Sequence, residues 1–338
     1  MKIFACLAFG LALVIALPVS AAESATTRRA PRTAGKARAP RKPPTPLTRP
    51  ANANEQQDAQ DLKEIAGYYM DSGILATKDM QPACFDCDPS TEGARIPSKQ
   101  CRDTYSDMYK NDTVDFRFVF GYIDNFNAED GPAREAAIEK LMRPCGGWLK
   151  GACGFKYESE DDEEVLVKTM TGPDGKEKKV RLTIVSSSAS TNLDRNRGEL
   201  ATLQANQSKH AREVFEDGLR NSDMTIYVGH GRDGAGPSFE PPVLRRNTLP
   251  GATRPGHTPD GREAPNFDWY KRHHESRDSM MAALASGPNP PKMLGMFACH
   301  TEKYFADRAL KASERNGVRK TGFVGSQGYT ALEAMYAQ

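Results

Sequence analysis

Two apolar stretches indicate the fold class most clearly: MTIYVGHG at residues 224–231 and KMLGMFACH at residues 292–300. Their strand portions are continuous apolar runs without alternation, which is typical of strands covered by helices on both faces. Segments with helical spacing and further strands lie on either side of them: a strand at 179–186, helices at 194–219, 268–285 and 302–315, and a strand at 321–326. This alternation predicts an α/β three-layer sandwich with a mostly parallel sheet over residues 161–338.

The region before this domain has a different pattern. A strand is expected at 115–123 and a helix at 132–142, and cysteines lie around both: Cys84, Cys87, Cys101, Cys145 and Cys153. We therefore expect residues 58–160 to form a smaller α+β part that contains disulfides. A hairpin is predicted after it, with strands at 164–171 and 179–186 joined by the turn Gly172-Pro173-Asp174-Gly175. Cys299 stands apart, so the pairing of the six cysteines beyond residue 22 stays open.

The beginning of the chain predicts export. Residues 1–22 contain Lys2, an apolar run from Ile3 to Leu17 and small residues after it, which is typical of a cleaved signal peptide. Residues 23–57 are rich in proline and alanine, and residues 24–54 carry eight Lys or Arg and no acidic residue. We expect a disordered basic linker and a periplasmic or secreted protein, with association to anionic envelope polymers as a further possibility. The remaining body is mildly acidic, so nucleic acid is not an expected partner.

Reactive side chains follow two of the buried strands. His230 comes directly after the strand at 224–229, and Cys299 follows the strand at 292–298. Parallel sheets place their sites beyond the carboxyl ends of the strands, so neighbouring strands would bring the thiol and the imidazole together. An imidazole beside a thiol supports nucleophilic attack on a carbonyl carbon, and the N–H groups of Gly231 and Cys299 could stabilise the oxyanion.

The order of an apolar strand with His-Gly and an apolar strand with Ala-Cys resembles the caspase–legumain–gingipain superfamily of cysteine peptidases, clan CD. The resemblance covers roughly residues 178–328. It implies a caspase-like sheet, Cys299 as nucleophile, His230 as general acid/base, Gly231 as oxyanion donor and a protein or peptide substrate. Phe297 occupies the place of the glutamine that caspases carry before Ala-Cys, which indicates a distinct bacterial branch.

Other side chains near these tips are candidates for substrate binding, namely Asp233, Glu240 and Glu302. The leading hypothesis is a peptidase or amidase, and the alternative is a noncatalytic envelope-binding protein on a peptidase-like scaffold. A metal-dependent hydrolase that uses histidines such as His257, His273, His274 and His300 is a weaker interpretation, because the spacing matches no metal motif. We expect no cofactor and no metal. The sequence leaves the oligomeric state and the cleavage preference open.

Overall fold

The computed structural model describes residues 56–57, 59–61, 63–64, 99–124, 127–145, 153–244 and 266–326. The predicted signal peptide at 1–22 and the predicted linker at 23–57, except its last two residues, lie outside these ranges, as do Cys84 and Cys87. In the described part of the chain, no helix is long and apolar enough to cross a membrane.

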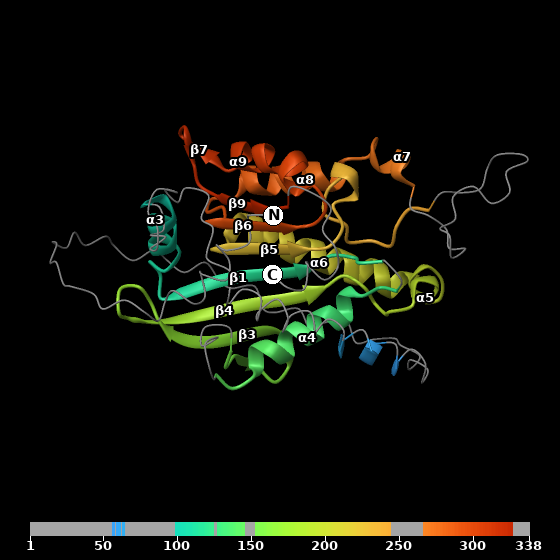
Figure 1. Ribbon diagram of the computed structural model, residues 1–338, viewed down its shortest axis with the longest axis horizontal. Coiled ribbons are helices and arrows are strands. Elements are labelled where there is room, and N and C mark those ends of the chain that lie inside the picture. The colour runs from blue at the N-terminus through green and yellow to red at the C-terminus, as the bar shows by residue number, and fades with distance from the viewer. Residues whose placement is uncertain are drawn as a thin grey trace, which may run out of the picture.

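A seven-stranded sheet forms the centre of the molecule, in the order β2-β3-β4-β1-β5-β6-β9 (Figure 1). Five neighbouring strands are parallel: β4 (Glu177–Ser186), β1 (Thr113–Phe120), β5 (Met224–Val228), β6 (Met293–Phe297) and β9 (Gly322–Gly325). At one edge, β2 (Lys156–Ser159) and β3 (Asp162–Thr171) run antiparallel. The predicted α/β class with a mostly parallel sheet is therefore confirmed, and so is the hairpin of β3 and β4.

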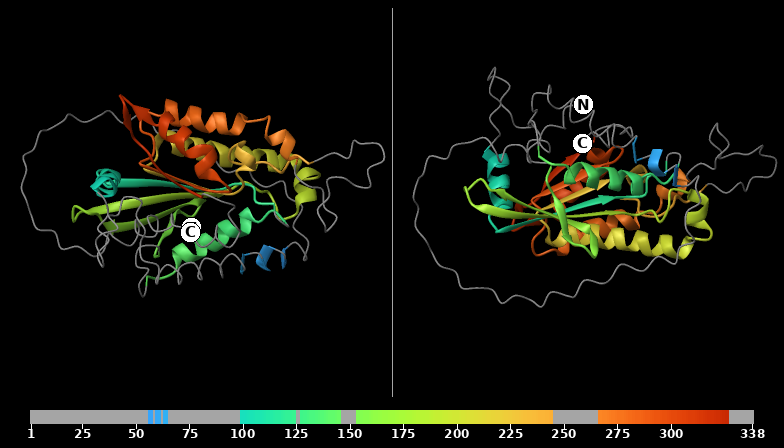
Figure 2. Two further views of the ribbon diagram at one scale, coloured as in Figure 1. Left: turned by 45° about the horizontal axis from the view of Figure 1, so that its top comes forward. Right: turned by 90° about the horizontal axis from the view of Figure 1, so that it is seen from below.

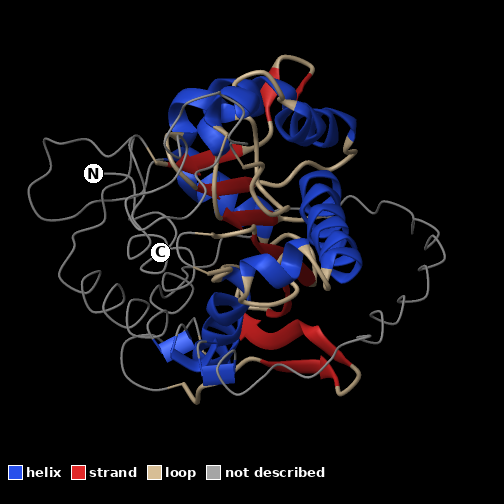
Figure 3. Cartoon of the chain, turned by 90° about the vertical axis from the view of Figure 1, so that its right-hand side faces the viewer, coloured by secondary structure: helices blue, strands red, loops and turns tan. Residues whose placement is uncertain are grey.

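Helices cover both faces of this sheet, as Figures 2 and 3 show. One face carries α6 (Ala201–Asn221), α8 (Glu275–Ser286) and α9 (Asp307–Ala312), and the other carries α4 (Asp130–Met142). Successive side chains of a strand point to opposite faces, so β1 contributes Phe116 and Phe120 to the core beneath α4 and Val119 to the core beneath α6. Burial on both faces explains why the inner strands are continuously apolar.

Three predicted helices are divided in the structure. The segment at 194–219 consists of α5 (Leu193–Arg197) and α6, because the N–H of Gly198 bonds the carbonyls of Asp194 and Arg195 and ends the first helix. The segment at 268–285 consists of α7 (Phe267–Tyr270) and α8. The last comprises a π-helix, η3 (Glu302–Ala306), then α9 and a small pair of strands, β7 (Glu314–Arg315) and β8 (Val318–Arg319). Helix α3 (Lys99–Met108) precedes β1.

The N-terminal region does not have a sheet of its own in the described part of the chain. β1 and α4 come from residues 58–160, but β1 lies between β4 and β5, with Phe120 paired to Ser186 and Val228. The expected separation at residue 160 therefore does not separate two sheets. Local sequence pattern identifies β1 as a strand, but the partners of a strand lie far along the chain and depend on tertiary packing.

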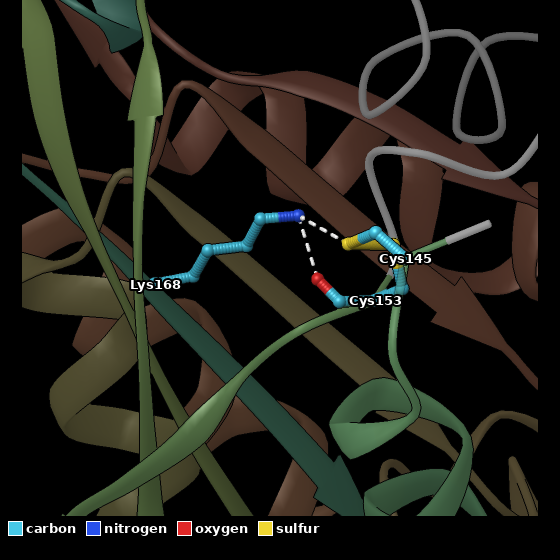
Figure 4. Close-up of a disulfide and its surroundings, with 3 residues drawn as sticks. All are labelled: Cys145, Cys153 and Lys168. Atoms are coloured by element: carbon cyan, nitrogen blue, oxygen red, sulfur yellow. Dashed lines mark hydrogen bonds between the residues drawn. A yellow bond between two sulfur atoms is a disulfide. The ribbon is translucent and has the colours of Figure 1, made fainter.

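A disulfide joins Cys145 and Cys153 between α4 and β2 (Figure 4). The ammonium group of Lys168, on β3, donates a hydrogen bond of 2.6 Å to the Cys153 carbonyl and lies 3.5 Å from the Cys145 sulfur. Burial lowers the pKa of Lys168. These contacts fasten the segment after α4 to the antiparallel edge of the sheet.

Candidate active site

The chain segments of His230 and Cys299 leave the sheet at the same edge, directly after β5 and β6. Val228 is paired with Phe297, and the N–H of Gly229 still bonds the Phe297 carbonyl, so His230 and Cys299 each lie two residues beyond the last matched pair. A Cβ atom at Gly231 would lie 3.1 Å from the carbonyl oxygen of Cys299. The absence of a side chain at Gly231 therefore lets these two loops approach closely.

A third strand contributes a carboxylate that the sequence analysis did not single out. Asp124 lies in the loop after β1, and its Oδ1 is 2.7 Å from Nε2 of His230. The same oxygen accepts a hydrogen bond of 2.8 Å from Nη2 of Arg232. The Asp124 side chain is only 4% exposed, whereas that of His230 is 22% exposed. The carboxyl ends of β1, β5 and β6 thus bring a carboxylate, an imidazole and a thiol to one edge of the sheet.

The burial of His230 and the charges around it determine the protonation state of its imidazole. Burial alone raises the pKa of Asp124, but Arg232 and His230 outweigh it and lower that pKa to about 2. Burial, and then the charge of Arg232, lower the pKa of His230, while its hydrogen bond to Asp124 opposes them. An ionised carboxylate only accepts hydrogen bonds, so Nε2 of the neutral imidazole carries the proton. Its Nδ1 is then a basic nitrogen at neutral pH.

Hydrogen bonds of the buried Tyr227 hydroxyl fix the backbone of His230. The Tyr227 hydroxyl donates a hydrogen bond of 2.9 Å to the His230 carbonyl and accepts one of 2.7 Å from the Ser238 N–H. Tyr227 is fully buried, and Gly121 lies against its hydroxyl, where a Cβ would approach to 2.3 Å. Buried hydrogen bonds of this kind fix the direction in which the strand end leaves the sheet.

The loop that carries Cys299 is fixed by the last strand. The Thr301 hydroxyl donates to the Met296 carbonyl at 2.9 Å and accepts from the Ser326 N–H at 2.7 Å. The Ser326 hydroxyl, directly after β9, donates to the Ala298 carbonyl. Cys299 is half-buried and is not part of the Cys145–Cys153 disulfide. A half-buried residue on a hydrogen-bonded loop is suited to carry a nucleophile, because its position is fixed while part of the residue meets solvent.

The three candidate substrate-binding carboxylates have different surroundings. Asp233 accepts a hydrogen bond of 3.1 Å from the Tyr304 hydroxyl. Glu240 forms an ion pair with Arg212 of α6, and Glu302 is exposed at the start of η3. Of these, Asp233 and Glu302 each come three residues after His230 or Cys299 in the chain. The role of all three in binding substrate stays a prediction.

The metal interpretation gains no support from the described residues. The ring of His273 stacks on Trp269 with 4.0 Å between centroids, and its Nδ1 lies 2.8 Å from the Trp269 carbonyl. Within the described ranges, no group of three or more His, Cys, Asp or Glu side chains is placed to hold a metal ion. His257 lies outside these ranges.

Asp124 and Arg232 are the site residues that sequence reasoning missed. A polar residue after a predicted strand was the available signal for Asp124, since Gly121-Tyr122-Ile123-Asp124 follows an alternating aromatic run. That signal becomes specific only when β1 is known to lie beside β5. Arg232 lies in the stretch Gly231-Arg232-Asp233-Gly234, whose composition by itself indicates only a loop. Comparison of the chain with protein-family models, curated proteins and solved structures finds no significant match.

Proposed function

We propose that this protein is a thiol hydrolase that cleaves a peptide or amide bond. Cys299 is the nucleophile, His230 is the general acid/base and Asp124 orients the imidazole. The contact of 2.7 Å between Asp124 and His230, beside the register position of Cys299, is the observation that carries the proposal. A carboxylate that holds one nitrogen of a histidine, with the other nitrogen directed to a nucleophile, is a recurrent catalytic arrangement on unrelated folds.

The reaction proceeds in two halves. Nδ1 of His230 accepts the proton of the Cys299 thiol as the sulfur attacks the carbonyl carbon, and the resulting oxyanion meets the N–H groups of Gly231 and Cys299. Collapse of the tetrahedral intermediate breaks the C–N bond, and the imidazolium gives its proton to the leaving amine. A water molecule, deprotonated by the same imidazole, then attacks the thioester. The carboxylic acid leaves and the thiol is regenerated with that proton.

The composition of the cluster supports this assignment over a purely structural one. Moving a carboxylate and a guanidinium out of water carries a desolvation penalty, and apolar residues of similar volume are often as stable. Here both charges are almost fully buried, and the carboxylate contacts a histidine that remains partly exposed. Perturbed titratable groups at the carboxyl edge of a parallel sheet are a frequent mark of an active site.

The test uses the thiol itself. Cys299 should react with iodoacetamide or with a peptide carrying an electrophilic warhead, as mass spectrometry of the alkylated peptide would report. His230→Ala should slow this alkylation by about tenfold or more at pH 7, because the variant lacks the general base that accepts the thiol proton. Glu213→Gln, on the exposed face of α6, is the matched control and should react like the wild type.

Hydrolysis is measured separately with a mixture of peptides of diverse sequence. Cys299→Ala should abolish every cleavage seen with the wild type while retaining the circular dichroism of the folded chain. Equal alkylation rates in the wild type and His230→Ala would refute the pairing of thiol and imidazole. Cleavage that persists in Cys299→Ala would refute the assignment of Cys299 as the nucleophile. If neither alkylation nor cleavage depends on His230, a noncatalytic scaffold replaces the present proposal.

A further inference from the structure

Arg232 is an unusual residue to find beside a histidine base. Its side chain is only 5% exposed, and its three polar or aromatic contacts come from separate segments. Nη2 bonds Asp124 at 2.8 Å, Nε bonds the Ser238 hydroxyl at 3.2 Å, and the guanidinium lies 5.4 Å from the centre of the Tyr270 ring, on α7. Such contacts compensate a buried cation and hold the guanidinium in one orientation.

The backbone at Arg232 and Asp233 adopts a strained conformation. Arg232 has φ 42° and Asp233 has φ 56°, in the left-handed region that residues other than glycine seldom occupy. The turn is closed by a hydrogen bond of 2.9 Å from the Gly234 N–H to the Gly231 carbonyl. Strain of this kind concentrates at functional sites. Here the turn coincides with the return of the guanidinium toward the carboxylate that binds His230.

We propose that Arg232 is a positioning residue, which binds the same Asp124 oxygen as His230 and so keeps the imidazole neutral, with Nδ1 available to the Cys299 thiol. The proposal rests on the function proposed above and specifies how that site is kept in its basic form. A histidine and a carboxylate without a third partner favour the imidazolium, since the carboxylate attracts the proton. A permanent cation on the same oxygen offsets the carboxylate charge and repels a second positive charge.

Besides burial, the charged groups among the described residues that act on the His230 ring are Arg232 and Asp124. Tyr227, on β5, binds the His230 carbonyl through its hydroxyl, and Cys299 follows β6 at the same register. Burial and the charge of Arg232 lower the pKa of His230, and Asp124 raises it. The geometry and the charges therefore lead to the same result, which is a neutral ring that donates through Nε2.

The test measures the titration of His230 directly. In the full chain with ¹⁵N- and ¹³C-labelled histidine, His230→Gln identifies the signal of His230 among the six histidines. The wild type should show a neutral ring at pH 7 with the proton on Nε2. Arg232→Met should raise the midpoint by about one to two pH units, a ten- to hundred-fold greater affinity for the proton. Arg232→Lys keeps the charge and should restore a midpoint near that of the wild type.

Two further variants test the direction in which each charge moves the titration midpoint of His230. Asp124→Asn should move the His230 midpoint down, and Arg220→Met, which removes an arginine paired with Glu216 on α6, should leave it unchanged. A protonated ring at pH 7 in the wild type would overturn the proposal even if Arg232→Met does not fold. An unchanged midpoint in Arg232→Met, or equal shifts in the Met and Lys variants, would also overturn it. None of these measurements needs a substrate, so their outcome is separate from the hydrolase test.

Discussion

Replacement of Asp124 by asparagine is the sharpest test of the energetics of this site. The change keeps the shape of the side chain and an oxygen that can accept a hydrogen bond, but it removes the charge that partners Arg232. The guanidinium then remains buried without its counter-ion, and removal of one partner is the costly way to break a buried ion pair. We therefore expect the variant to fold with reduced stability.

The magnitude follows from the pKa of the carboxyl group. Folding lowers the pKa of Asp124 from 3.8 to about 2. Each unit corresponds to about 1.4 kcal/mol, so the charged carboxylate stabilises the folded chain by roughly 2 to 3 kcal/mol at neutral pH. Because the folded pKa is the lower one, this contribution is present above about pH 4 and is lost as the pH falls toward 2.

Urea denaturation followed by tryptophan fluorescence measures this difference. At pH 7, the free energy of unfolding of Asp124→Asn should lie roughly 2 to 3 kcal/mol below that of the wild type, and the gap should narrow between pH 4 and pH 3. Glu213→Gln, which removes an exposed carboxylate, should change stability by less than about 0.5 kcal/mol. A gap below about 0.5 kcal/mol at pH 7, or one that is equal at pH 7 and pH 3, would refute the reasoning.

Two other predictions concern packing and pH. Gly121→Ala should destabilise the chain by about 1 to 3 kcal/mol in the same urea assay, because the new Cβ would lie 2.3 Å from the Tyr227 hydroxyl. Gly131→Ala, whose nearest contact is 3.5 Å, is the control, and equal losses in the two variants would contradict the packing argument. The hydrogen bond of 2.8 Å with Glu164 raises the pKa of His210, so its contribution to stability is complete below about pH 6.5 and is lost as the pH rises through the folded pKa. Thermal unfolding of His210→Gln should therefore differ from the wild type more at pH 6 than at pH 9, and the opposite order would disprove the assignment.

Much of the fold is visible in short stretches of the sequence. The runs at 224–231 and 292–300 become β5 and β6 with His230 and Cys299 at their tips, as expected for strands buried on both faces. The segments with helical spacing become helices on the two faces of the sheet. Their breaks were not predicted, because hydrophobic periodicity continues across the gap at Gly198 where hydrogen bonding changes.

The candidate site was only partly accessible from the sequence. The register of β5 and β6 is the arrangement that the sequence analysis required for the thiol and the imidazole. Asp124 had no comparable signal, because acidic residues follow many strands and a single carboxylate carries no motif. The same holds for Arg232, whose sequence neighbourhood is typical of a solvated loop, although its side chain is buried.

Periodicity and apolar runs reflect burial over about five to ten neighbouring residues, so the class of the fold and the positions of His230 and Cys299 after two strands could be predicted from the sequence. Tertiary packing, in contrast, places β1 beside β5 and brings Arg232 to an oxygen of Asp124, 108 positions earlier in the chain. Backbone hydrogen bonds between strands are much the same whatever the side chains, so the neighbour of a strand is chosen by packing across the whole sheet. The chemistry proposed for His230 depends on that choice.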